Sequence, residues 1–151
     1  MQNKNNIVNW LGYGGLIPFI GLALLEWIGI FSEEVITKLL INYAAIILSF
    51  VGALHWGFAM TLNEINPNQR RWLYIWSVIP ALIAWGCLSL SSPYALGLLI
   101  ATFLYHLFKD LELSKGNQAL LPSWYLTIRV RLTVVVCISL FTTLLATSFK
   151  S

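Results

Sequence analysis

Charged residues are scarce in this chain of 151 residues: Lys and Arg number nine, and Asp and Glu number six, which together make 10% of the total. An ordinary soluble domain is about 25% charged. Hydrophobic residues make up 58% of the chain, and its mean hydropathy is +0.77. Too few polar residues remain to cover a water-exposed surface, so the composition excludes a soluble enzyme and a disordered regulator. It indicates an integral membrane protein.

Cysteine and histidine are also rare, with two residues of each. Cys87 and Cys137 lie inside apolar runs and form no Cys-x-x-Cys pair, which excludes a small secreted domain held together by disulfides. The sequence lacks a His/Cys cluster with metal-ligand spacing, a Gly-x-Gly-x-x-Gly motif and a His-Glu-x-x-His motif. We therefore expect no enzyme activity, no cofactor and no bound metal.

Five apolar runs are long enough to cross a bilayer, whose hydrocarbon core of about 30 Å requires about 20 apolar residues per helix. They are residues 11–31, 39–62, 72–90, 94–110 and 126–149. The sequence predicts an all-α fold, with one polytopic membrane domain over residues 1–151 built as a bundle of five transmembrane helices. Glu26 interrupts the first run where a signal-peptidase site would need small residues, so we expect this helix to be retained.

Positive charges are divided unevenly between the two ends of these spans. Seven Lys and Arg residues lie at the N-terminus and in the second and fourth connections, whereas two lie in the first connection and at the C-terminus. Because Lys and Arg concentrate on the cytoplasmic side of membranes, this bias predicts a cytoplasmic N-terminus and a periplasmic C-terminus. The basic residues form no stripe, so we expect no nucleic-acid partner despite the pI of about 9.0.

Glu26 requires an explanation, because a carboxylate in hydrocarbon is costly. We expect it to face the bundle, with Asn42 on the second helix as its partner. On one continuous helix Gly12 and Gly15 share the face of Glu26, where another backbone can approach closely. Two interpretations stay open for Glu26, namely a structural hydrogen bond between helices and a role in handling protons or ions.

A second group of ionisable residues is predicted near the cytoplasmic surface. His106 and Asp110 are four residues apart and therefore share one face of the fourth helix. Arg129 enters the fifth helix at the same level, so an Asp110–Arg129 pair is the natural core of a cluster, with His55 about one turn deeper. These residues are candidates for proton or ion handling. The alternatives are charges that extend to the interface and hydrogen bonds between helices.

Small residues and prolines indicate where the helices approach one another or bend. Gly52 and Trp56 belong to a stripe along the second run, and Gly57 follows directly. Pro18 and Pro80 each remove a helical hydrogen bond, so we expect them to kink the first and third spans.

Four segments, in this order, resemble a known family. They are Gly15-Leu-Ile-Pro18-Phe, Gly52-x-x-His55-Trp56-Gly57, Trp76-Ser-Val-Ile-Pro80 and Leu121-Pro-x-Trp124-Tyr125-x-x-x-Arg129. Over nearly its whole length the chain resembles the small bacterial inner-membrane proteins related to eukaryotic transmembrane protein 69. The resemblance implies a multi-pass protein of the bacterial cytoplasmic membrane. That family has no established activity.

These observations favour a non-enzymatic inner-membrane protein that supports membrane energetics, proton or ion homeostasis and the permeability barrier of the envelope. Its concrete form is proton or ion conduction, with Glu26 as an acceptor in the outer half and the group around His55 as a relay in the inner half. Two other interpretations stay open: a scaffold or assembly factor for another membrane protein, and a lipid- or quinone-binding protein. The lipid bilayer is the expected partner, and the sequence leaves open a homo-oligomer and a membrane-protein partner.

Overall fold

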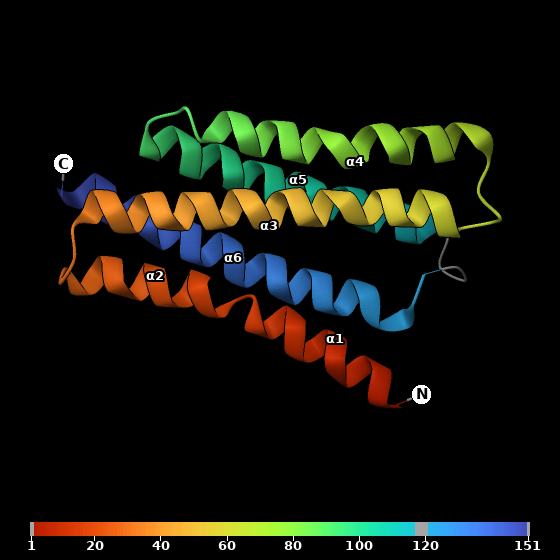
Figure 1. The fold of residues 1–151 in the computed structure, drawn as a ribbon, viewed down its shortest axis with the longest axis horizontal. Coiled ribbons are helices and arrows are strands. Elements are labelled where there is room, and N and C mark those ends of the chain that lie inside the picture. The colour runs from red at the N-terminus through yellow and green to blue at the C-terminus, as the bar shows by residue number, and fades with distance from the viewer. Residues whose placement is uncertain (1, 117–120, 151) are drawn as a thin grey trace.

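All the regular secondary structure in the computed structural model is α-helical over the residues it describes, 2–116 and 121–150. The helices are α1 (Gln2–Gly14), α2 (Ile17–Ile28), α3 (Glu33–Thr61), α4 (Pro67–Cys87), α5 (Ser92–Gly116) and α6 (Ser123–Lys150). They run along the long axis of the molecule, and α1 continues into α2 as one broken pass (Figure 1). The prediction of an all-α bundle is confirmed.

The outer surface of the bundle has the apolar character of a surface that contacts lipid. Four segments are long and apolar enough to cross a membrane: Ile7–Ile28, Glu33–Thr61, Ser92–Lys115 and Trp124–Phe149. The remaining helix, α4, has 21 residues and carries Arg70 and Arg71 near its start. Large apolar side chains are exposed around the outside, among them Trp85 at 73% and Tyr94 at 74%. Such a surface indicates contact with hydrocarbon, and the protein is therefore a multi-pass membrane protein.

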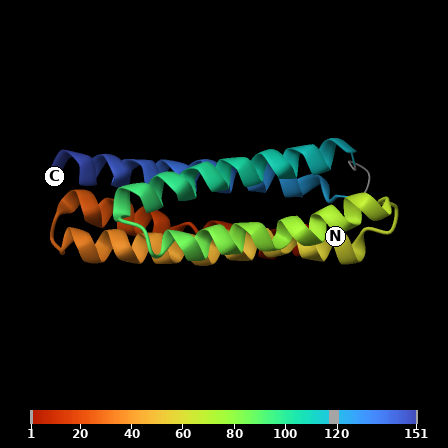
Figure 2. The same ribbon diagram turned by 90° about the horizontal axis from the view of Figure 1, so that it is seen from above.

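The helices form two layers. Seen from above, α5 and α6 lie in one layer, and α3 and α4 lie in the other (Figure 2). The start of α1, the α3–α4 connection, the end of α5 and the start of α6 lie at one end of the bundle, which is termed the N-terminal end below (Figure 1). The α2–α3 and α4–α5 connections and the end of α6 lie at the opposite end.

The first pass is broken at the position where we expected a kink. Helix α1 ends at Gly14 and α2 begins at Ile17, so that Pro18 falls in the first turn of the new helix. A proline is well tolerated there, because the first backbone N–H groups of a helix have no partner within it. The Tyr43 hydroxyl of α3 donates a hydrogen bond of 2.9 Å to the carbonyl of Gly15. The break is thereby tied to the rest of the bundle.

Helices α3 and α4 approach most closely at Gly52. A Cβ atom at this position would lie 2.9 Å from the carbonyl oxygen of Ser77 and 3.1 Å from Cβ of Pro80. Glycine is required here because no side chain fits between the two backbones. Helix α4 continues through Pro80, which is buried against α3.

Several helices extend beyond the predicted spans at one end or both, whereas α2 ends at Ile28 and α4 ends at Cys87, each three residues before the predicted end. Helix α5 reaches Gly116 instead of ending at residue 110, and α3 begins at Glu33 instead of residue 39. Hydropathy reports the part of a helix that lies in hydrocarbon, whereas the backbone hydrogen bonds continue into the interface. The residues Lys115 and Gly116, followed by Asn117, form a sequence typical of a turn; Lys115 and Gly116 belong to α5, and residue 117 lies outside the described residues.

Candidate functional site

Asp110 lies at the centre of a buried cluster that α3, α5 and α6 form together. Its Oδ2 accepts a hydrogen bond of 2.8 Å from Nε of Arg129, and its Oδ1 accepts one of 3.0 Å from the Tyr125 hydroxyl. His55 Nε2 lies 3.5 Å from Oδ1, and His106 Nδ1 lies 3.5 Å from Oδ2. The structure therefore contains the expected Asp110–Arg129 pair and brings both histidines to the same carboxylate. These five residues are termed the Asp110 cluster.

Helical spacing explains how the cluster is assembled. His106 and Asp110 are four residues apart on α5, and Tyr125 and Arg129 are four residues apart on α6, so each pair shares one helix face. Helices α5 and α6 lie side by side, and the two faces meet. His55 completes the cluster from α3.

The two histidines lie side by side, and His106 is about one helical turn further from the N-terminal end than Asp110. Their ring centroids are 4.8 Å apart in an edge-to-face arrangement. Helix α5 extends to Gly116, which places His106 about three turns inside its helix. His106 is also covered by the indole of Trp76, whose ring centroid is 6.0 Å away.

The cluster is enclosed between two apolar regions. On one side is the larger core, which contains Leu48 of α3 and Phe103 of α5. On the other side is a smaller core at the N-terminal end, which contains Ala59 and Leu113. Asp110 and His106 are fully buried, and Arg129 is 5% exposed. Opposite charges in such a place must be paired, because each alone would lose its hydration without compensation.

A metal ion is the first ligand to consider for two histidines and a carboxylate. The potential ligand atoms of His55, His106 and Asp110 lie within 4.8 Å of one another. However, the Arg129 guanidinium contacts the Asp110 carboxylate and also places Nη2 3.4 Å from Nδ1 of His106. A cation at this point would meet the positive charge of Arg129, so the geometry favours the guanidinium as the cation that Asp110 binds.

A polar cavity connects the cluster with the N-terminal end of the bundle. Its volume is about 510 Å³, and His55 belongs to its wall. The other lining residues come from α4 and α5 and the turn before α4: Asn66, Asn68, Gln69, Trp72, Leu73, Lys109, Glu112 and Leu113. His55 Nδ1 has no hydrogen-bond partner among the described residues. His55 is thus the member of the cluster that also lines this cavity.

Glu26 is buried, as expected, but its predicted partner is wrong. Thr37 of α3 donates a hydrogen bond of 3.2 Å to Oε2 of Glu26, whereas the Asn42 side chain is exposed. Residues 37 and 42 differ by about 140° around a helix that turns 100° per residue, so only one of them can face α2. Glu26 is also remote from the Asp110 cluster, because Thr37 and His55 are about 27 Å apart along α3 at 1.5 Å per residue.

The predicted glycine face of the first helix is used inside the protein. A Cβ atom on Gly12 would meet Leu132 of α6 at 3.2 Å, and Gly15 contacts Tyr43 of α3. The prediction that these glycines share a face with Glu26 assumed a continuous helix. The break after Gly14 changes the angular relation between Gly12 and Glu26, so that prediction no longer applies. The face therefore provides no argument for a homo-oligomer.

Trp56 of the stripe on α3 and the neighbouring Gly57 face outwards. Trp56 is about half exposed, and its ring contacts Tyr74 of α4 edge-to-face at 5.0 Å. Gly57 has open space where a Cβ atom would lie. Only Gly52 of this group is a site of close helix contact.

Three functional candidates were absent from the predicted site residues. Tyr125 was noted only as a member of the Pro-x-Trp-Tyr segment, although its spacing of four from Arg129 places both on one face. Thr37 and Thr133 each lie in an apolar helix that contains at least one other threonine, and nothing in the sequence distinguishes them from the others. The Tyr125–Arg129 spacing was the one available clue.

The fold and the site define a class: multi-pass helical membrane proteins with a buried ionisable cluster. A family model described as "Protein of unknown function (DUF3429)" matches residues 5–145. Transmembrane protein 69 of Xenopus tropicalis is 36% identical over 143 residues, which cover 92% of this chain and 54% of that protein. The chain spans about half the length of this relative, and no solved structure matches. The protein belongs to the DUF3429 family, as the predicted resemblance to relatives of transmembrane protein 69 implied.

Proposed function

We propose that this protein is a non-enzymatic protein of the bacterial inner membrane that handles protons, with the Asp110 cluster as its proton-binding site. Its N-terminal end would face the cytoplasm, as the distribution of Lys and Arg predicts. A role of this kind would support proton homeostasis and the permeability barrier of the envelope.

The observation that carries this proposal is the placement of His55. One side of its ring faces Asp110 at 3.5 Å, and the residue also lines the polar cavity of about 510 Å³. Imidazole can gain and lose a proton near neutral pH, which makes histidine the common residue of proton relays. Because Arg129 balances the charge of Asp110, the cluster is neutral before it takes up a proton and carries one positive charge afterwards.

A conduction pathway would also have to run from the Asp110 cluster to the opposite end of the bundle, and this section has less support than the section at the N-terminal end. Between the cluster and Glu26 the interior is mainly apolar, with Leu40, Leu48 and Leu99 fully buried, and the buried polar groups there are separate hydroxyls such as those of Thr133 and Thr143. This distribution of polar residues supports proton uptake from the N-terminal end. The described residues of one chain offer no continuous polar path to the opposite end. Glu26 therefore needs a separate test.

The experiment measures dissipation of a pH gradient in proteoliposomes that contain the purified protein. We expect a flux above that of protein-free liposomes, and we expect it to fall to that background in His55→Gln. Asn42→Ala is the matched control, because Asn42 lies on the same helix but is exposed on its outer face. Glu26→Gln tests the half of the bundle that contains Glu26. A loss of flux equal to that in His55→Gln would extend the proton route to Glu26.

Two outcomes would contradict the proposal. One is the absence of flux above protein-free liposomes, and the other is wild-type flux in a folded His55→Gln variant. Either result would favour a scaffold or assembly factor, in which the buried charges only fix the register of the helices. Thermal unfolding of each variant establishes that it is folded before its flux is interpreted.

A further inference from the structure

A largely apolar groove lies beside Arg129, between α1, α3 and α6. The volume of its inner chamber is about 120 Å³, and that of its outer chamber is about 510 Å³. Both chambers share the lining residues Leu11, Gly12, Phe50, Val51, Arg129 and Leu132. Leu11 and Phe50 are also exposed on the outer surface of the bundle, so the groove opens towards the lipid. It is termed the Arg129 groove.

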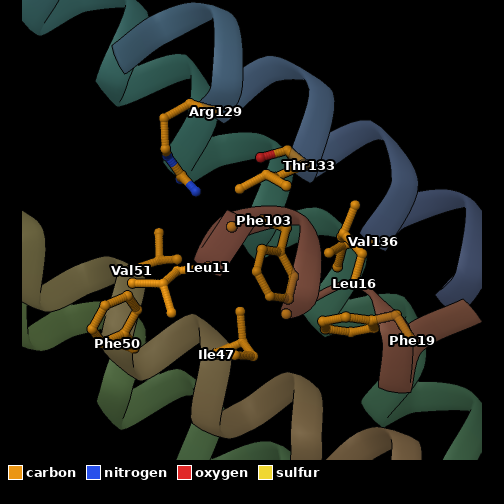
Figure 3. Close-up of a pocket in the computed structure, with 13 residues that line it drawn as sticks. Leu11, Leu16, Phe19, Ile47, Phe50, Val51, Phe103, Arg129, Thr133 and Val136 are labelled. Atoms are coloured by element: carbon orange, nitrogen blue, oxygen red, sulfur yellow. The ribbon is translucent and has the colours of Figure 1, made fainter. Parts of the chain in front are cut away.

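Two polar side chains of α6 point into the inner chamber, namely Arg129 and Thr133 (Figure 3). Thr133 is 1% exposed, and its hydroxyl has no hydrogen-bond partner among the described residues. A buried hydroxyl without a partner costs free energy, and a ligand that accepts its hydrogen bond removes this cost. The inner chamber therefore offers hydrogen-bond donors within an otherwise apolar wall.

The charge of the site selects a neutral ligand. Asp110 already balances Arg129 at 2.8 Å. A carboxylate or phosphate in the groove would add a negative charge without a counter-ion in a region of low dielectric constant. A carbonyl oxygen accepts a hydrogen bond from Thr133 or Arg129 without adding charge.

The size and lining of the groove favour a ring with a long apolar tail. An engineered cavity of about 150 Å³ takes up benzene, and the inner chamber has a comparable volume of about 120 Å³. Phe19 and Phe103 line this inner chamber and offer aromatic faces to a ring. Trp124 and Ile128 line the larger outer chamber, where a hydrocarbon tail can lie.

We propose that the Arg129 groove binds a lipid-soluble quinone, with the ring in the inner chamber and the tail in the outer chamber. One carbonyl accepts hydrogen bonds from Thr133 and Arg129. Binding does not depend on the proposed proton handling, because the groove and the Asp110 cluster are lined by different side chains apart from Arg129 and Tyr125. Its test uses binding alone, so it can fail or succeed independently of the proton flux.

The test measures quenching of tryptophan fluorescence in the intact protein, held in nanodiscs of quinone-free phospholipid. The probe is a benzoquinone with a decyl tail. Trp124 in the outer chamber is the reporter, and its signal is the part of the quenching of all seven tryptophans that Trp124→Phe removes. Dodecylbenzene has the ring and tail without carbonyls, and oleate has a carboxylate in their place. We expect saturable quenching by the quinone, and we expect neither other compound to compete with it at tenfold excess.

Two variants locate the site. Val136→Phe fills the inner chamber and should abolish saturable quenching, whereas Val134→Phe places the same ring on the exposed side of α6 and should bind like the wild type. Thr133→Val removes one hydrogen bond and should weaken binding about fivefold. It keeps the proposal testable if Val136→Phe does not fold.

Three results would overturn the proposal: no saturable quenching, equal competition by oleate or dodecylbenzene, or wild-type affinity in either Thr133→Val or a folded Val136→Phe. The second result would make the groove a site for acyl chains.

Discussion

Replacing Asp110 by Asn removes the negative charge that Arg129 binds, and leaves the guanidinium buried without compensation. The two side chains are joined at 2.8 Å and are 0% and 6% exposed. Breaking a buried ion pair from one side costs about 3–5 kcal/mol in soluble proteins. An arginine at the centre of a membrane helix costs a similar amount, about 2.5–3.5 kcal/mol. We therefore expect Asp110→Asn to lower the free energy of unfolding by about 3 kcal/mol.

The double variant distinguishes an unpaired charge from a simple packing defect. Asp110→Asn combined with Arg129→Gln removes both charges, so the second substitution should restore much of the stability that the first one removes. We expect a coupling free energy of at least about 1.5 kcal/mol between the two positions, as neighbouring groups in one network typically show.

The assay is thermal unfolding in mild detergent, followed by circular dichroism and supported by unfolding titrations with a denaturing detergent. For a chain of this size a loss of about 3 kcal/mol corresponds to a fall in Tm of about 6–12 °C. Additive effects of the two single substitutions would refute the reasoning, because they would show that the two buried charges do not stabilise one another.

Two further predictions concern contacts around the same helices. Gly52→Ala places a Cβ atom 2.9 Å from the Ser77 carbonyl and should lower stability by about 1–3 kcal/mol. Gly57→Ala on the same helix has open space and should be neutral or stabilising by about 0.5–1 kcal/mol; equal Tm values for the two variants would contradict the close contact. Tyr125→Phe removes the hydroxyl that donates to Asp110 at 3.0 Å and should cost about 1 kcal/mol. An unchanged Tm would mean that this hydrogen bond contributes nothing.

The sequence was sufficient to predict the all-α bundle and the pairing of Asp110 with Arg129, because both follow from local rules. Hydropathy identifies apolar helices, and a spacing of four residues puts Asp110 beside His106 on one helix face. A buried carboxylate then requires a positive partner, and Arg129 at the start of the next helix was the natural one. These inferences needed no knowledge of how distant helices pack.

The errors came from steps that depend on helix boundaries and on packing. The break after Gly14 changes the angle around the helix axis between Gly12 and Glu26. A helical wheel drawn through both residues assumes a continuous helix and cannot represent this break. The choice of Asn42 depended on depth alone, whereas the direction of the side chain around α3 decides which residue can reach Glu26. Depth is readable from a hydropathy plot, but the rotation of one helix against another is set by side-chain packing.

Arg129 links the two proposed activities and cannot be used to separate them. Its Nε donates to Asp110 in the cluster, and its side chain also lines the groove. A ligand carbonyl that accepts a hydrogen bond from this guanidinium would compete with Asp110 for it, and a less tightly held Asp110 would bind a proton more readily. His55 and Thr133 each belong to only one of the two sites, since His55 is absent from the groove and Thr133 from the cluster. If the two sites are coupled, Thr133→Val will reduce the dependence of proton flux on added quinone while leaving the flux without quinone intact, and His55→Gln will abolish the flux while leaving quinone affinity unchanged.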